Sequence, residues 1–257
     1  MKIEMIVCDL DGALLRSDTS ISQFSKGVLQ ACRSSGIKVV AATARPVATI
    51  REVLNMDDFD AIISDGGAAA IVGGKKIFEE IIDANTVNAL VADFLAAGII
   101  FSAEGGEHYF HNSNDESGYA EFRQSKGYHA VKTDFAAGVD VPSYKLNPRI
   151  SPEDVSKILV PFPELDFIEY TGFSFVRIAH KDSTKWQALR KVAGHFGIDT
   201  AHTAAFGDDF IDVEMLANVG FGVAMSNAIP EAKAAAKFVC ASNDEDGIAK
   251  WLEENVL

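Results

Sequence analysis

The sequence predicts an α/β protein in which a doubly wound core carries an inserted α+β domain. Three observations support this fold class. Short apolar runs alternate with amphipathic helical patterns at both ends of the chain, which is typical of parallel strands covered by helices on both faces. The middle of the chain instead contains several short β-like segments. With 257 residues, the chain is long enough to bury one large core or two smaller ones.

The N-terminal part of the chain begins with runs that predict buried strands. Residues 3–8 form an apolar run that only Glu4 interrupts, and residues 38–42 and 61–63 have the same character. Between the first two runs, apolar residues at helical spacing predict an amphipathic helix that ends before Gly36. This order of strand, helix and strand is typical of a parallel sheet.

The C-terminal part repeats this alternation. Leu189, Val192, Ala193 and Phe196 have the relative spacing 0, 3, 4 and 7, which predicts one buried face of a helix. The elements expected after this helix are a strand at 203–206, a helix after Asp208, a strand at 221–224, a helix from Pro230 and a closing helix from Glu245.

The middle of the chain is predicted to form a separate α+β domain at residues 83–182. Gly73 and Gly74 predict a hairpin just before it. Within it we expect helices near 86–97, 117–126 and 152–159, and β-like segments at 99–103, 107–111, 143–146, 167–170 and 173–178. Residues 1–82 and 183–257 would then join into one Rossmann-like domain that is discontinuous in sequence.

Composition limits the classes of partner. Lys and Arg total 23 and Asp and Glu total 37, which gives a formal charge of −14. This acidic balance argues against nucleic acid as a partner. No apolar stretch has the length of about 20 residues that a membrane helix needs, so we expect no membrane partner. The three cysteines, Cys8, Cys32 and Cys240, are far apart in sequence and suit a reducing, cytoplasmic location.

The first candidate site follows the first predicted strand, at Asp9, Asp11 and Gly12. In open parallel sheets, ligands bind beyond the carboxyl ends of the strands. In an extended segment Asp9 and Asp11 point to the same side, and two such carboxylates need a divalent cation or a shared proton. The competing interpretation is a simple turn, because Asp-Gly is a common turn pair.

The second candidate is the acidic run after the strand at 203–206, with Asp208, Asp209 and Asp212. Asp208 and Asp212 are four residues apart, so they share one face of a helix. Acidic residues at a helix N-terminus also have a purely structural explanation, because they cap the helix and favour its dipole. Asp209 in particular is open to the interpretation as a cap.

Two further candidates are polar residues at element boundaries. Thr43 and Ala44 follow the second strand, where a hydroxyl and backbone N–H groups suit a phosphate oxygen, and Pro46 suits the first turn of a helix. Lys185 lies in the first turn of the predicted helix, where a cation opposes the helix dipole. This position indicates a nearby anion, although a solvated lysine is the alternative.

Together the four candidates resemble the motifs of the haloacid dehalogenase-like (HAD) phosphohydrolases. Those motifs are an Asp-x-Asp-Gly-Thr run, a Thr or Ser, a Lys, and a Gly-Asp-x-x-x-Asp run. Their counterparts here follow that order along the whole chain, with Ala13 in place of the Thr of the first motif. An insertion of this size between Thr43 and Lys185 is similar to the large α/β cap of the Cof-type branch. Residues 64–68 and the run from Met225 to Ala228 also resemble that branch.

The resemblance implies a Mg²⁺-dependent phosphatase. It makes Asp9 the nucleophile that forms an aspartyl-phosphate and Asp11 the general acid and base. Mg²⁺ would be held by Asp9, the backbone carbonyl of Asp11, and Asp208. Asp212 and Asp209 would be outer partners of the metal. The residues implied at the phosphate are Thr43, Ala44, Lys185 and Asn227.

The substrate implied is a small phosphorylated metabolite such as a sugar phosphate, a nucleotide or a cofactor phosphate. The cap would select this substrate, and the protein would be a monomer or a homodimer. Ala13, Ala44, Ile211 and Trp186 depart from the residues usual in the family. The first three of them keep open the alternative of a catalytically impaired phosphate-binding or regulatory module. A phosphomutase is a further alternative, because related proteins of this architecture use the same aspartyl-phosphate.

Overall fold

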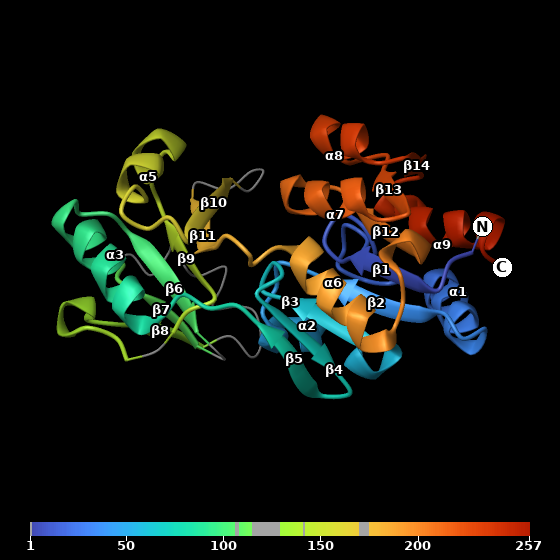
Figure 1. Cartoon of the computed structure of the whole chain (residues 1–257), viewed down its shortest axis with the longest axis horizontal. Coiled ribbons are helices and arrows are strands. Elements are labelled where there is room, and N and C mark those ends of the chain that lie inside the picture. The colour runs from blue at the N-terminus through green and yellow to red at the C-terminus, as the bar shows by residue number, and fades with distance from the viewer. Residues whose placement is uncertain (1, 106–107, 115–128, 141, 170–174) are drawn as a thin grey trace. The chain divides into compact units, whose positions relative to one another are not determined.

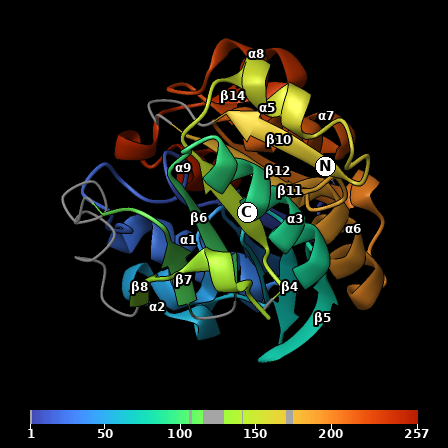
Figure 2. The same ribbon diagram turned by 90° about the vertical axis from the view of Figure 1, so that its left-hand side faces the viewer.

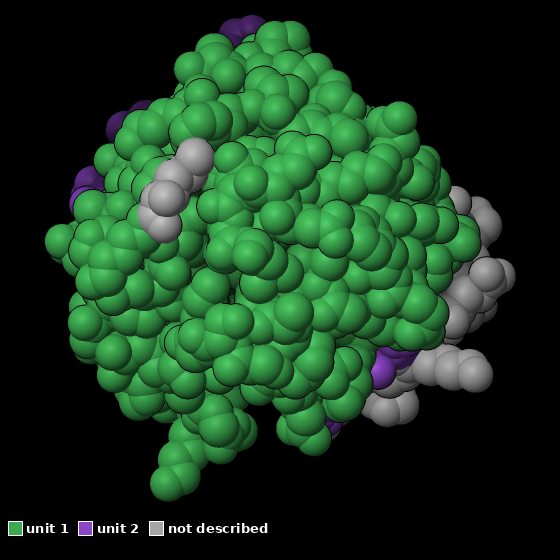
Figure 3. Space-filling model, turned by 90° about the vertical axis from the view of Figure 1, so that its right-hand side faces the viewer, with its two compact units in different colours: residues 1–45, 53–79, 184–257 green, residues 46–52, 80–183 purple. Residues whose placement is uncertain are grey.

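The computed structural model describes residues 2–105, 108–114, 129–140, 142–169 and 175–257. The chain divides into two compact units (Figure 3). Unit 1 contains Met1–Arg45, Val53–Glu79 and Thr184–Leu257, and unit 2 contains Pro46–Glu52 and Glu80–Ser183. The sequence places the boundaries at 82/83 and 182/183, so the two divisions differ by a few residues. The sequence does not anticipate that residues 46–52 group with unit 2.

Unit 1 is built on an eight-stranded sheet with the strand order β14-β13-β12-β1-β2-β3-β4-β5. From β14 to β3 the neighbouring strands are parallel, and β4 and β5 complete the sheet as antiparallel strands. The bounds are β1 (Met5–Asp9), β2 (Lys38–Ala42), β3 (Ala61–Ser64), β4 (Ala69–Val72), β5 (Lys75–Glu79), β12 (Thr203–Gly207), β13 (Phe221–Met225) and β14 (Phe238–Cys240).

Helices cover both faces of this sheet, which confirms the doubly wound fold class (Figure 1). On one face, Met5 and Val7 of β1 share a core cluster with residues of α6 and α7. On the other face, Phe206 of β12 meets Trp251 of α9 with ring centroids 5.4 Å apart. The helices of unit 1 are α1 (Gln23–Ser34), α6 (Lys185–Phe196), α7 (Val213–Asn218), α8 (Pro230–Ala235) and α9 (Gly247–Asn255), while α2 (Val47–Val53) crosses the division between the units.

Two helices of unit 1 begin later than the sequence indicates. The acidic run first forms a 3-10 turn at Phe210–Asp212, and α7 starts only at Val213. The closing helix starts at Gly247 instead of Glu245, because Asn243–Glu245 is also a 3-10 turn and Asp246 then takes a left-handed conformation with φ 56°. In both places a capping box satisfies backbone N–H groups of the 3-10 turn, and the regular helix begins only after this turn.

Unit 2 contains a six-stranded sheet with the order β10-β11-β9-β6-β7-β8. Residues from α3 and α5 and from alternate positions of the strands form one core cluster, so both helices pack on the same face of the sheet (Figure 2). The bounds are α3 (Ala84–Ala96), β6 (Phe101–Gly105), β7 (His108–His111), β8 (His129–Lys132), β9 (Lys145–Pro148), α5 (Pro152–Ile158), β10 (Leu165–Glu169) and β11 (Val176–His180).

The elements expected for the inserted domain agree with unit 2 where they can be compared. The helix predicted near 86–97 starts two residues earlier, because the Asp83 side chain accepts hydrogen bonds from the backbone N–H groups of Asn85 and Thr86. The helix predicted at 117–126 lies outside the described residues. Residues 107, 170 and 173–174 of the predicted β segments also lie outside them.

Candidate active site

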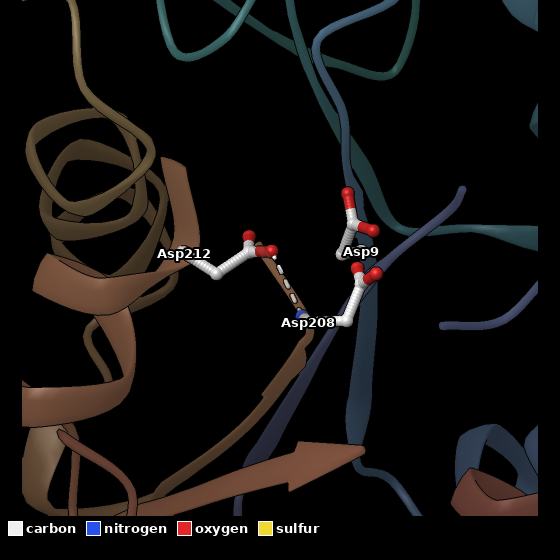
Figure 4. Close-up of side chains that lie close together, drawn as sticks. All are labelled: Asp9, Asp208 and Asp212. Atoms are coloured by element: carbon white, nitrogen blue, oxygen red, sulfur yellow. Dashed lines mark hydrogen bonds between the residues drawn. The ribbon is translucent and has the colours of Figure 1, made fainter. Parts of the chain in front are cut away.

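The site forms where two neighbouring parallel strands end. Asp9 is the last residue of β1, and Asp208 follows the last residue of β12. These strands are paired in parallel, so their carboxyl ends lie at the same edge of the sheet. Carboxylate oxygens of Asp9, Asp208 and Asp212 all lie within 4.8 Å of one another (Figure 4). The structure thus brings together the two acidic runs that the sequence separates by about two hundred positions.

Lys185, the first residue of α6, is buried inside this cluster. Its Nζ lies 2.5 Å from Asp9 Oδ1 and 2.7 Å from Asp212 Oδ1, and its side chain is 0% exposed. The interpretation of Lys185 as a solvated lysine is therefore wrong. Burial lowers its pKa, but the carboxylates of Asp212 and Asp9 more than offset burial, so the pKa of Lys185 is raised above its usual range.

The three carboxylates carry more negative charge than one lysine balances. Burial, followed by repulsion from Asp212 and Asp208, raises the pKa of Asp9 well above its usual range, although Lys185 opposes this rise. Burial and Asp212 raise the pKa of Asp208 to about 7. Asp208 Oδ1 is also buried without a hydrogen-bond partner among the described residues. A divalent cation would satisfy this oxygen and lower both pKa values.

Asp212 has its oxygens engaged by the protein itself. Oδ1 accepts from Lys185, and Oδ2 accepts from the backbone N–H of Asp208 at 3.1 Å (dashed in Figure 4) and from that of Asp209 at 3.3 Å. The Asp209 side chain accepts from Phe210 N at 2.8 Å and forms a capping box with Asp212. Asp209 is therefore a cap of the 3-10 turn, which is the structural alternative that the sequence left open.

The turn after β1 passes directly against Asp208. Gly12 has φ +77°, and a Cβ added to it would lie 2.2 Å from Asp208 Oδ2, so only glycine fits there. The Gly12 carbonyl accepts a hydrogen bond of 2.8 Å from Asn227 Nδ2, and Asn227 Oδ1 accepts one of 3.2 Å from Asn243 N. Asn227 therefore contacts the backbone carbonyl of Gly12 and the backbone N–H of Asn243. The sequence contained no signal for Asn243.

Asp11 does not lie in the carboxylate cluster. Its two oxygens accept from Arg45, with Nε to Oδ2 at 2.7 Å and Nη2 to Oδ1 at 2.6 Å. The expectation that Asp9 and Asp11 share one side rests on an extended backbone, but β1 ends at Asp9 and a turn follows. Arg45 is a partner of Asp11 that the sequence analysis missed, because the two residues are 34 positions apart.

Thr43 lies at the end of β2, beside β1 in the sheet. It is fully buried, and its Oγ1 accepts from Arg45 N at 3.1 Å. Ala44 follows it and is half-buried. Nearby, Gly67 approaches the start of α6 so closely that a Cβ would lie 2.1 Å from the Thr184 carbonyl carbon. The Gly66-Gly67 pair was the only sequence signal of this contact.

Three of the residues that depart from the family pattern lie outside the carboxylate and lysine cluster. Ala13 is buried, and Trp186 packs against the core cluster of unit 1 with the Arg190 guanidinium 6.0 Å from its ring centroid. Ile211 is half-buried in the 3-10 turn. None of these three replaces a side chain of the carboxylate and lysine cluster.

Unit 2 has a polar face on its sheet, opposite the face that carries α3 and α5. Lys145 Nζ lies 3.0 Å from Glu104 Oε2, and both side chains are buried. Asn147 Nδ2 donates to Glu104 Oε1 at 2.9 Å, and buried Arg177 donates to the Ser183 carbonyl at 3.1 Å.

In the part of the chain that the structure describes, no helix has the length and apolar character needed to cross a membrane.

The fold and the site define a doubly wound α/β protein with a carboxylate and lysine cluster at the carboxyl edge of its parallel sheet. The family model of the haloacid dehalogenase-like hydrolases matches residues 6–252. The chain therefore belongs to the haloacid dehalogenase-like hydrolases. This assignment confirms the resemblance found from the motifs and places the chain among enzymes.

Relatives and solved structures agree with this family over nearly the whole chain. The protein of Bacillus subtilis named "Putative phosphatase YxeH" is 29% identical over 99% of this chain and 98% of its own. The 5-amino-6-(5-phospho-D-ribitylamino)uracil phosphatase YwtE of the same organism is 27% identical, with 98% of each covered. The HAD subclass IIB sugar phosphatase BT4131 has a TM-score of 0.84 at 27% identity, with 98% of each chain covered. These relatives support the phosphatase class and the Cof-type branch.

Proposed function

We propose that this protein is a Mg²⁺-dependent phosphatase that hydrolyses a small phosphorylated metabolite through an aspartyl-phosphate. The observation that carries the proposal is the contact of Lys185 with both Asp9 and Asp212 beside Asp208. A buried nucleophilic carboxylate next to a lysine and a further carboxylate is suited to bind and attack a phosphoryl group.

The residues present fit a magnesium ion. Mg²⁺ prefers oxygen ligands, and the cluster offers carboxylate oxygens from Asp9 and Asp208, of which Asp208 Oδ1 is buried and unsatisfied among the described residues. The backbone carbonyl of Asp11 is the third ligand we propose. Asp212 would act from outside, because its oxygens are held by Lys185 and by backbone N–H groups. When bound, Mg²⁺ neutralises the carboxylates and the transferring phosphoryl group.

The protein's own residues perform two steps. In the first, an Asp9 oxygen forms a bond to phosphorus while the bond between phosphorus and the leaving oxygen breaks. The leaving oxygen keeps the electron pair of the broken bond and receives a proton from Asp11. In the second, Asp11 removes a proton from water, the water oxygen bonds to phosphorus, and Asp9 is released. Lys185, the Thr43 hydroxyl and the Ala44 backbone N–H hold the phosphoryl oxygens in both steps. The family resemblance also implies Asn227 for this role.

The names of two relatives and the polar face of unit 2 support a proposal for the substrate class. YwtE is named for a phosphorylated ribityl compound and BT4131 for sugar phosphates. We propose that unit 2 selects the leaving group, and that the substrate is a sugar phosphate, a nucleotide or a cofactor phosphate. Its buried Glu104, Lys145 and Asn147 provide both acceptors and donors, which hydroxyl-rich groups require. The free, buried cysteines suit action in the reducing cytoplasm.

Release of inorganic phosphate from a panel of phosphorylated metabolites tests the proposal. The panel is run with Mg²⁺ and with EDTA, on the wild type, on Asp9→Asn and on the matched control Asp57→Asn at an exposed site. Turnover that requires Mg²⁺, survives in the control and disappears in Asp9→Asn supports the proposal. Normal activity of Asp9→Asn contradicts it. Mg²⁺ binding without turnover on any compound would favour the phosphate-binding module instead.

A further inference from the structure

Arg45 makes a two-point contact with Asp11. The Nε and Nη2 atoms of its guanidinium donate separately to the two Asp11 oxygens, at 2.7 and 2.6 Å. Such a fork matches the planar geometry of a carboxylate and fixes its orientation. The contact is reachable from solvent, because the Arg45 side chain is 25% exposed and that of Asp11 is 52% exposed.

The backbone of Arg45 is anchored in the turn that we assign to the phosphate. Its N–H donates to Thr43 Oγ1 at 3.1 Å, and its carbonyl accepts from Asp65 N at 3.0 Å. Its guanidinium therefore extends from a fixed point two residues beyond the Thr43 hydroxyl. A phosphate oxygen bound by the Thr43 hydroxyl would therefore lie close to the backbone from which this guanidinium extends.

The contact has a direct consequence for Asp11. Each of its oxygens accepts a hydrogen bond from Arg45, so the closed fork holds both oxygens toward the guanidinium and fixes the orientation of the carboxylate. A phosphate group presents the same pattern of oxygens to a guanidinium as a carboxylate does. Phosphate and Asp11 are thus alternative partners for one cation.

We propose that Arg45 is a phosphoryl-binding residue that Asp11 holds in the ligand-free protein, and that it exchanges Asp11 for a phosphate oxygen when substrate binds. Binding of the phosphoryl group then releases Asp11. The inference rests on the proposed function for the role of Asp11, but the exchange itself is an equilibrium between two partners. It can therefore be measured by binding alone, without turnover.

The test is calorimetric titration of inorganic phosphate at a fixed Mg²⁺ concentration. Four forms of the full chain are compared: wild type, Arg45→Gln, Asp11→Ala and the double variant. Asp11→Ala keeps its backbone carbonyl. We expect Arg45→Gln to weaken phosphate binding about tenfold, in the range of one lost charge-assisted hydrogen bond. We expect Asp11→Ala to strengthen it several-fold, because Arg45 is no longer held by Asp11.

The double variant separates exchange from simple charge repulsion. If Arg45 carries the effect, Asp11→Ala changes nothing in the Arg45→Gln background. An equal gain in both backgrounds means that Asp11 only repels phosphate, and this overturns the proposal. Wild-type affinity of Arg45→Gln also overturns it. Arg33→Gln is the matched control, because Arg33 pairs with Asp60 and its side chain is also 25% exposed, and it should bind phosphate as the wild type does.

Failure of this inference can be told from failure of the proposed function. A wild type that hydrolyses substrates while Arg45→Gln binds phosphate normally keeps the phosphatase and loses the role of Arg45. A wild type that binds phosphate with the expected pattern but hydrolyses nothing keeps the role of Arg45 and loses the phosphatase. A wild type that binds no phosphate in the presence of Mg²⁺ overturns the role of Arg45, while the turnover assay alone decides the phosphatase. Circular dichroism of each variant verifies that it is folded.

Discussion

Lys185 Nζ lies 2.7 Å from Asp212 Oδ1, in a pair whose side chains are 0% and 1% exposed. The same ammonium group also contacts Asp9. One buried cation thus links β1, which carries the proposed nucleophile Asp9, to the 3-10 turn that ends at Asp212. We therefore expect both the stability of the fold and the proposed chemistry to depend on this contact.

Replacing Lys185 with Met is expected to destabilise the protein as well as to abolish turnover. The substitution leaves Asp9 and Asp212 buried without their cation, which costs about 3–5 kcal/mol in comparable cases. Urea unfolding at pH 7 without Mg²⁺ measures the change in the free energy of unfolding. Lys250→Met, on the exposed side of α9, is the control and should change it little. A Lys185→Met variant as stable as this control would contradict the electrostatic role.

Gly12→Ala is expected to weaken Mg²⁺ binding. Its Cβ would collide with Asp208 Oδ2 at 2.2 Å, so the turn or the carboxylate must move. Gly197→Ala is a matched control, because Gly197 has φ +69° but nothing lies within 4 Å of its added Cβ. Both variants should lose about 1 kcal/mol of stability from the strained backbone. Titration of Mg²⁺ by thermal shift should distinguish them, and equal Mg²⁺ affinities would refute the collision.

The stabilisation by Mg²⁺ is expected to increase with pH. The pKa of Asp208 is about 7 in the fold against 3.8 ordinarily, so between these values the folded protein binds a proton that the unfolded chain has lost. Without metal, the free energy of unfolding therefore falls as pH rises through this window. Mg²⁺ takes the place of that proton, so its stabilising effect should be small at about pH 5 and large at about pH 8.

This pH dependence can be measured from the Tm at each pH with and without Mg²⁺. A potassium salt at equal ionic strength is the control for screening. An increase of the Tm by Mg²⁺ that stays constant from pH 5 to pH 8 would mean that no carboxylate of raised pKa takes part in metal binding.

Asn227→Ala is expected to lower kcat/KM about tenfold, because small displacements of a catalytic turn have effects of this order or larger. The substitution removes the 2.8 Å hydrogen bond that holds the Gly12 carbonyl. Asn255→Ala removes a hydrogen bond of the same length, from Asn255 Nδ2 to the Trp251 carbonyl in α9, and should leave kcat/KM unchanged. Equal values for the two variants would show that Asn227 does not position the turn.

The sequence alone was sufficient to predict the core of the fold. The runs at 38–42 and 203–206 predict strands, and the spacing of Leu189, Val192 and Ala193 predicts a buried helix face, as the structure has them. These patterns are local, because a strand or helix imposes its own period on the residues within it. That Asp9 and Asp208 lie at the same edge of the sheet was predictable for a similar reason, since parallel strands end at one edge, whereas the pairing of their two strands is a finding of the structure.

The details of the site depended on contacts that no local pattern encodes. Asp209 was ambiguous until its hydrogen bond to Phe210 N identified it as a cap. The start of the closing helix was misplaced for the same kind of reason, because a capped 3-10 turn at Asn243–Glu245 precedes it. Caps and helix starts both depend on which side chain satisfies the first free N–H groups.

The sequence by itself determined the alternation of strands and helices, the order of the acidic and basic motifs, and the family. Only the tertiary structure assigned Asp11 to Arg45, 34 positions away, and Gly12 to Asn227, 215 positions away. The physical reason is that backbone periodicity sets which face a side chain occupies. Its partner is set by the turn that follows a strand and by the distant segments that the fold brings beside it.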